Sequence, residues 1–208
     1  MSRAVSSTPL LVVITAPSGA GKSTLCDNIR SALPGVSRAV TCTTREPRSG
    51  EVDGVDYYFL SEEEFLARVD SGEFLENALV HGSHYGVLKS ELRAKLASGG
   101  DVLLNIDVQG AATIHERAAT DPVLSRSLVT VFLCPPSLKE LELRLRGRGT
   151  DSDEAIVKRL AIAKNEMAQA EKFDYTMTSQ TREADAGRLL VIIESVRLAK
   201  REATLANE

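Results

Sequence analysis

The stretch APSGAGKST, residues 16–24, follows the apolar run LLVVIT at residues 10–15 and precedes a helical pattern. A buried strand that turns through a glycine-rich loop into a helix gathers backbone N–H groups where they can hold an anion. The motif G-x-x-x-x-G-K-[ST] therefore predicts a phosphate-binding loop, although Ala16 replaces its first glycine. We expect this change to be tolerated, because the first position ends the strand and need not adopt a positive φ.

Individual residues of this loop have distinct chemistry. Gly19 and Gly21 let the backbone approach phosphate oxygens, Lys22 can reach the β- and γ-phosphates, and the Ser23 hydroxyl can ligate Mg²⁺. The predicted binding site for a nucleoside triphosphate consists of nine consecutive residues: Ala16, Pro17, Ser18, Gly19, Ala20, Gly21, Lys22, Ser23 and Thr24. The loop does not identify the phosphoryl acceptor, because many unrelated reactions use it.

The composition describes an ordinary globular chain. Its 208 residues, 43% of them hydrophobic, fit one domain with insertions better than two independent domains. A net charge of −4 gives no general attraction to nucleic acid or to an anionic membrane, so we expect neither as a partner.

Cysteine and apolar content predict the compartment. Cys26, Cys42 and Cys134 are an odd number without C-x-x-C spacing, which fits neither a disulfide framework nor a zinc site. No stretch approaches the roughly 20 apolar residues of a membrane span. We therefore expect a cytoplasmic protein.

The pattern of apolar runs predicts an α/β fold. Residues 10–15, 102–106 and 128–134 are short and apolar at successive positions, as parallel strands covered on both faces should be, and 36–41 and 175–178 are further candidates. Capping boxes at Ser61 and Ser137 predict helix starts. A helical stripe spans 152–171, and a last helix is expected over 183–201 with Leu189, Ile193 and Val196 facing inward.

Two segments interrupt the alternation of strands and helices. Residues 41–99 begin with a Gly/Pro/Arg-rich loop and contain most of the aromatic residues, which predicts an inserted α+β subdomain. The segment RLRGRGTDSDE, residues 144–154, is too rich in glycine and charge for the interior of an element, and it predicts a mobile flap between two helices.

The segment TCTTREPRSGEVDGVDYYF, residues 41–59, suggests what receives the phosphoryl group. Arg45 and Arg48 can direct two guanidinium groups at one phosphate, and Tyr57 and Tyr85 can donate neutral hydrogen bonds to its other oxygens. Such a set suits a monophosphate. A solvated basic turn beside core tyrosines is the alternative that these residues alone leave open.

Six motifs together resemble those of guanylate kinases over nearly the whole chain. They occur in the family's order and spacing: APSGAGKST, TTREPRSGE…DYYF, FLENA, HYG, IDVQG and LRGRGTDSDE. The resemblance implies an α/β fold of the P-loop NTPase type: a parallel-sheet core flanked by helices, an inserted α+β subdomain that binds the nucleoside monophosphate, and a lid. The expected boundaries are 1–40, 100–143 and 172–208 for the core, 41–99 for the GMP-binding subdomain and 144–171 for the lid.

The resemblance also implies a reaction and its substrates. ATP would phosphorylate GMP, and also dGMP, with Mg²⁺ as the cofactor. Matching positions assign a GMP-binding set in which four residues bind the phosphate and the last three address guanine: Arg45, Arg48, Tyr57, Tyr85, Thr41, Glu76 and Asp107. The assignment of carboxylates to guanine agrees with the chemistry of this base, since a carboxylate can accept from N1–H and the 2-amino group.

Catalytic and metal-binding roles follow from the same resemblance. The catalytic set contains cations that would stabilise charge on the transferring phosphoryl group: Lys22, Arg45, Arg144, Arg148 and Arg159. Ser23 would ligate Mg²⁺, with Asp107 contributing through a bound water. Lid closure would exclude water as a competing acceptor.

Three positions depart from the family pattern, and two other functions stay open. Asn105 replaces an acid, Val87 replaces a hydroxyl residue, and Ser179 stands where an asparagine commonly contacts adenine. A non-catalytic domain that binds a phosphopeptide through Arg45, Arg48 and Tyr57 is one alternative. A related kinase with another nucleotide or a sugar phosphate as acceptor is the other. The sequence does not decide between a monomer and a homo-oligomer.

Overall fold

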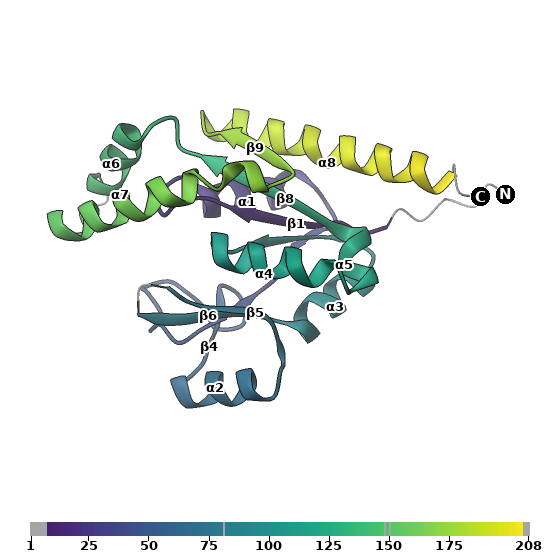
Figure 1. The fold of residues 1–208 in the computed structure, drawn as a ribbon, viewed down its shortest axis with the longest axis horizontal. Coiled ribbons are helices and arrows are strands. Elements are labelled where there is room, and N and C mark those ends of the chain that lie inside the picture. Colours follow the sequence, from purple (N-terminus) through teal and green to yellow (C-terminus); the bar gives the residue numbers. More distant parts are fainter. Residues whose placement is uncertain (1–7, 81, 148, 150, 206–208) are drawn as a thin grey trace.

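A five-stranded parallel sheet forms the centre of the computed structural model, which describes residues 8–80, 82–147, 149 and 151–205 (Figure 1). In spatial order, its strands are β2 (Val36–Arg38), β7 (Asp101–Asn105), β1 (Leu11–Thr15), β8 (Leu128–Cys134) and β9 (Tyr175–Thr178). All of β1 is buried, because it pairs in parallel with a strand on either side and is covered on both faces. The predicted α/β class with a parallel core sheet is confirmed.

Helices cover both faces of this sheet, and the alternation of side chains along β1 shows how. Val12 and Ile14 point into a core shared with α1 (Lys22–Ala32) and α8 (Arg182–Leu205). Leu11 and Val13 point into the opposite core, formed with α3 (Lys89–Ala97), α4 (Val108–Ala118) and α5 (Pro122–Ser127). The first core includes all three inward-facing residues predicted for the last helix, Leu189, Ile193 and Val196.

A second, smaller sheet is built from the inserted segment. Its order is β4 (Tyr57–Phe59), β3 (Thr41–Thr43), β6 (Ser83–Leu88) and β5 (Phe74–Val80), with α2 (Glu62–Asp70) packed on it through Phe65. The strand expected over 36–41 is present in the core sheet but is shorter than predicted, because the chain leaves this sheet after Arg38 and enters the second sheet at Thr41. Local β-propensity does not reveal that the two ends of such a segment pair with different strands.

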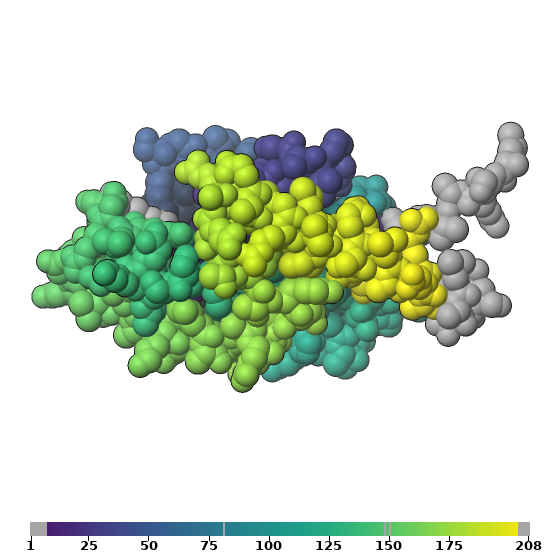
Figure 2. Space-filling view, turned by 90° about the horizontal axis from the view of Figure 1, so that it is seen from above, coloured from purple at the N-terminus to yellow at the C-terminus, as the bar shows by residue number. Residues whose placement is uncertain are grey.

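Helices α6 (Leu138–Arg146) and α7 (Asp153–Met167) pack against each other and form one end of the molecule, as Figures 1 and 2 show from two directions. The Ser61 and Ser137 side chains accept from backbone N–H groups three residues on, as predicted. The predicted start of the flap at residue 144 is wrong, because ion pairs at i,i+4 extend α6 to Arg146.

Two other helix limits also differ from the prediction. The helix expected over 152–171 ends at Met167 and is followed by a 3₁₀ turn, Ala170–Lys172. The last helix is longer than 183–201, since α8 spans Arg182–Leu205. None of the helices in the described parts of the chain is long and apolar enough to cross a bilayer.

Asp101, at the start of β7, joins three elements of the core. Its side chain is buried, and one carboxylate oxygen accepts from the backbone N–H of Leu10, 3.0 Å away, just before β1. The other oxygen lies 2.5 Å from the Arg197 guanidinium on α8. Removal of the carboxylate would leave a buried N–H and a half-buried cation without their partner.

We expect Asp101→Ala to lower the free energy of unfolding by about 2–3 kcal/mol, measured by urea denaturation. Glu194→Ala is the matched control, because Glu194 also contacts Arg197 but is exposed. It should cost less than about 0.5 kcal/mol. Equal effects of the two substitutions would contradict this role of Asp101.

Candidate active site

The loop between β1 and α1 has the geometry of an anion site. Gly21 adopts a φ of 105° and precedes α1, whose first turn has no side-chain cap, so its backbone N–H groups are free to bind a ligand. Gly19 has a φ of 97°, and a Cβ there would lie 2.9 Å from Cδ2 of Leu145 on α6. Both glycines are therefore required by backbone conformation, and Gly19 also by packing.

The Lys22 side chain lies across the front of this loop. Its ammonium donates to the carbonyl oxygens of Ile106, at 3.0 Å, and Ala16, at 3.4 Å. Burial lowers the pKa of Lys22, while the charges of Asp107 and Glu166 partly oppose this shift. Ala16 thus serves the loop through its backbone oxygen, which explains why a side chain is tolerated there.

A cleft of about 330 Å³ separates the loop, the second sheet and α7. It brings together most of the residues that the sequence assigned to the two substrates: Ala16, Pro17, Ser18, Gly19, Gly21, Lys22, Ser23, Thr24, Thr41, Arg48, Tyr57, Glu76, Tyr85, Asp107 and Arg159. One cavity therefore contains both the phosphate loop and the set expected to bind a nucleoside monophosphate.

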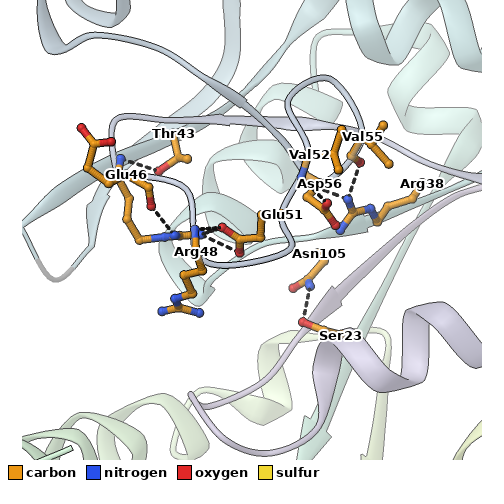
Figure 3. A network of polar contacts seen from close by, with 11 residues as sticks. Ser23, Arg38, Thr43, Glu46, Arg48, Glu51, Val52, Val55, Asp56 and Asn105 are labelled. Atoms are coloured by element: carbon orange, nitrogen blue, oxygen red, sulfur yellow. Dashed lines mark hydrogen bonds and ion pairs between the residues drawn. The ribbon is translucent and has the colours of Figure 1, made fainter. Parts of the chain in front are cut away.

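Arg45 does not line this cleft, because its guanidinium is engaged by Glu51. Nη2 lies 2.9 Å from both Glu51 carboxylate oxygens, and the same carboxylate accepts from the backbone N–H of Arg48 at 2.7 Å. Burial tends to raise the pKa of Glu51, but these hydrogen bonds outweigh it and hold the pKa below its ordinary value. In Figure 3 the Arg48 side chain is turned away from this network, on the side of Ser23 and Asn105.

Arg144 lies on the other side of the phosphate loop. It borders a second hollow of about 370 Å³ and donates to the Ala20 carbonyl at 3.4 Å and to Ser179 Oγ at 3.3 Å. Ser179 in turn donates to Asp185 at 3.0 Å. Ala20 lines this hollow and not the cleft, and Arg148 lies outside the described residues.

Glu76 and Asp107 form the acidic wall of the cleft. Asp107 caps α4 by accepting from the Gly110 N–H at 2.8 Å, and a Cβ on Gly110 would lie 2.6 Å from Glu76 Oε2. Burial, reinforced by the charge of Asp107, raises the pKa of Glu76 to about 8, although Arg117 and the Val87 N–H oppose the shift. Glu76 is therefore mostly protonated in the empty cleft at neutral pH.

Comparison with known proteins identifies the family of this chain. The family model described as guanylate kinase matches residues 8–195, which is most of the chain. The chain belongs to the guanylate kinase family.

Individual members of the guanylate kinase family match over nearly their whole length. The chain is 47% identical to the guanylate kinase of Bifidobacterium longum over 88% of its own length and 92% of the relative's. It is 45% identical to that of Aromatoleum aromaticum, with 90% and 89% covered. A crystal structure of guanylate kinase from Anaplasma phagocytophilum aligns with a TM-score of 0.73 at 31% identity, covering 92% of this chain and 87% of that one.

The three departures from the guanylate kinase pattern have different surroundings. Asn105 lies at the mouth of the phosphate loop, with Nδ2 3.5 Å from Ser23 Oγ (Figure 3). Val87 is fully buried opposite Glu76 in the second sheet, and Ser179 is held between Arg144 and Asp185. The first faces the cleft directly, and Ser179 faces the second hollow.

Sequence reasoning missed two acidic residues near the guanylate kinase site. Glu166, on α7, lines the cleft, and burial raises its pKa to about 6, with Lys22 lowering it and Asp107 raising it. The spacing of seven residues from Arg159 could have revealed it, because two helical turns return to the same face. Glu51 gave no such signal, since its pairing with Arg45 depends on how the loop folds.

Glu76→Gln should stabilise the fold in a pH-dependent way. The unfolded carboxyl ionises near its ordinary pKa of 4.5 but the folded one only near 8, so the wild type loses stability as pH rises between these values. We expect the variant's advantage in urea denaturation to be near zero at pH 4.5 and on the order of 2–4 kcal/mol at pH 8. Glu73→Gln, at an exposed neighbouring position, is the control. A pH-independent difference for Glu76→Gln would contradict the burial argument.

Proposed function

We propose that the protein transfers the γ-phosphoryl group of ATP to GMP, and also to dGMP, forming ADP and the nucleoside diphosphate. The observation that carries this proposal is the single cleft in which Lys22 and the phosphate loop face Arg48, Tyr57 and Glu76. A donor held at the loop and an acceptor held on the second sheet would meet in line within this space. Membership of the guanylate kinase family supports the same reaction.

Guanine would be recognised by the acidic wall. An ionised Glu76 can accept from both N1–H and the 2-amino group of guanine, and Thr41 at the same cleft can donate to an acceptor of the base. An ionised Glu76 would meet a lone pair at N1 of adenine, where guanine presents a donor. Because Glu76 is mostly protonated in the empty site, guanine binding would release a proton.

The GMP phosphate would lie between the second sheet and the 41–59 loop. Arg48, Tyr57 and Tyr85 already line the cleft there. Arg45 would join them by exchanging the Glu51 carboxylate for a phosphate, a similar bidentate acceptor.

Phosphoryl transfer would rely on cations from three elements. Lys22 is fixed by two carbonyl oxygens at the loop, and Arg159 enters the same cleft from α7. Arg144 borders the second hollow, which is suited to the base end of ATP, and Arg148 is assigned to the same group from the sequence alone. Movement of the 144–171 lid over the core and the 41–99 subdomain would bring these charges to the transferring group and exclude water.

The residues present also fit Mg²⁺ bound together with phosphates. Ser23 Oγ faces the cleft, with the Asn105 amide 3.5 Å away and Asp107 on the same wall. The described residues contain no cluster of three or more His, Cys, Asp or Glu side chains for a metal, so substrate oxygens and waters would complete the octahedron. When bound, Mg²⁺ neutralises charge on the phosphates.

Acceptor specificity tests the proposal directly. ADP release should be fast with GMP and dGMP and at least about a hundredfold slower, as kcat/KM, with AMP, CMP, UMP or ribose 5-phosphate. Comparable turnover of AMP would reject guanine recognition. Binding of GMP without turnover of any acceptor would favour a phosphopeptide-binding module instead.

Lys22→Ala should separate chemistry from acceptor binding. We expect kcat to fall by at least about a thousandfold, because the residue's charge acts on the transferring group, while GMP affinity by calorimetry stays within about threefold. Loss of both would indicate that the cleft has collapsed. Retained turnover would remove Lys22 from the mechanism.

A further inference from the structure

Helix α7 brings two charged side chains of opposite sign to the active-site cleft. Arg159 and Glu166 are seven residues apart, so they project from the same face, and both line the cleft with Lys22. Arg159 has its own carboxylate partner, since Nη2 lies 3.1 Å from Asp151. The Glu166 carboxylate forms no hydrogen bond with the described part of the chain, so the interactions of this side chain there are through charge.

The charges around Glu166 stabilise its carboxylate in the cleft only while the phosphate loop is empty. Lys22 attracts the carboxylate and Asp107 repels it, and these are the two ionisable groups that act on it from β1–α1 and from the start of α4. A nucleotide would bring three or four negative charges to the same ammonium. The net force on Glu166 would then change from attraction to repulsion.

We propose that Glu166 is a positioning residue that holds α7 beside Lys22 in the empty protein and is displaced by the phosphates of a bound nucleotide. This inference rests on the proposed function, because it requires that the loop binds a nucleoside polyphosphate. Its consequence is that Glu166 weakens nucleotide binding and speeds the release of ADP. A carboxylate on the lid helix thus competes with the substrate for one lysine.

Glu166→Gln tests this inference, because loss of an active-site charge is expected to strengthen nucleotide binding. The substitution keeps the shape of the side chain and removes its charge, so ADP should bind about fivefold more tightly or better. Calorimetry with ADP in excess EDTA at pH 8 keeps Glu166 ionised and excludes a metal contribution. The KM for ATP should fall with the Kd for ADP, GMP affinity should stay within about twofold, and amide hydrogen exchange in α7 of the empty protein should become faster.

Two further variants distinguish charge from structure. Glu171→Gln makes the same change at an exposed position on the 3₁₀ turn outside the cleft, and it should leave ADP affinity unaltered. Glu166→Asp keeps the charge, and its ADP affinity should stay within about threefold of the wild type. Weaker or unchanged ADP binding by a folded Glu166→Gln protein would overturn the inference. Failure of the wild type to bind ADP at all would reject the proposed function itself.

Discussion

The site depends on the pairing of β1 with β7 at the centre of the sheet. The two strands run in parallel with Ile14 opposite Asn105, so both end at the same edge. The residues that follow β1 form the phosphate loop, and those that follow β7 supply the Ile106 carbonyl, which holds Lys22, and the Asp107 cap. The loop, the lysine and Asp107 are therefore fixed by one register, as is usual at the carboxyl ends of parallel strands.

Carboxylates of the chain itself pair with several of the cations proposed to bind phosphates. Arg45 is paired with Glu51, Arg159 with Asp151, and Lys22 lies under the combined field of Asp107 and Glu166. Cations gathered for a polyphosphate would otherwise repel one another in a half-buried cleft. Each partner lowers that cost, and a ligand must offer several phosphate charges in the correct geometry to replace them together.

The sequence predicted the features that depend on neighbouring residues. It did not predict which distant segments pair with each other. The phosphate loop, the caps at Ser61 and Ser137, and the inward face of α8 follow from residues within one or two turns of each other. The break between β2 and β3 was missed, because β-propensity does not reveal which strand is the partner. Helix α6 extends beyond its predicted end, because side-chain ion pairs stabilise its last turn. The glycines of the following loop had suggested an earlier end. Assignment of the monophosphate set needed the resemblance to a family, because the arginines and tyrosines alone also fit a solvated turn.

Gly19 affects the packing of α6 as well as the backbone conformation of the phosphate loop. The space that a Cβ would occupy is bordered by Leu145 and Leu141 of α6, which are fully buried. The loop backbone proposed to bind phosphates thus also packs against α6. Helix α6 lies against the loop through Leu145 near Gly19 and through Arg144, which donates to the Ala20 carbonyl, while α7 brings charged side chains to the cleft. Ligand charge can therefore act on both helices, on α7 through Arg159 and Glu166 at the cleft and on α6 through Arg144 at the second hollow.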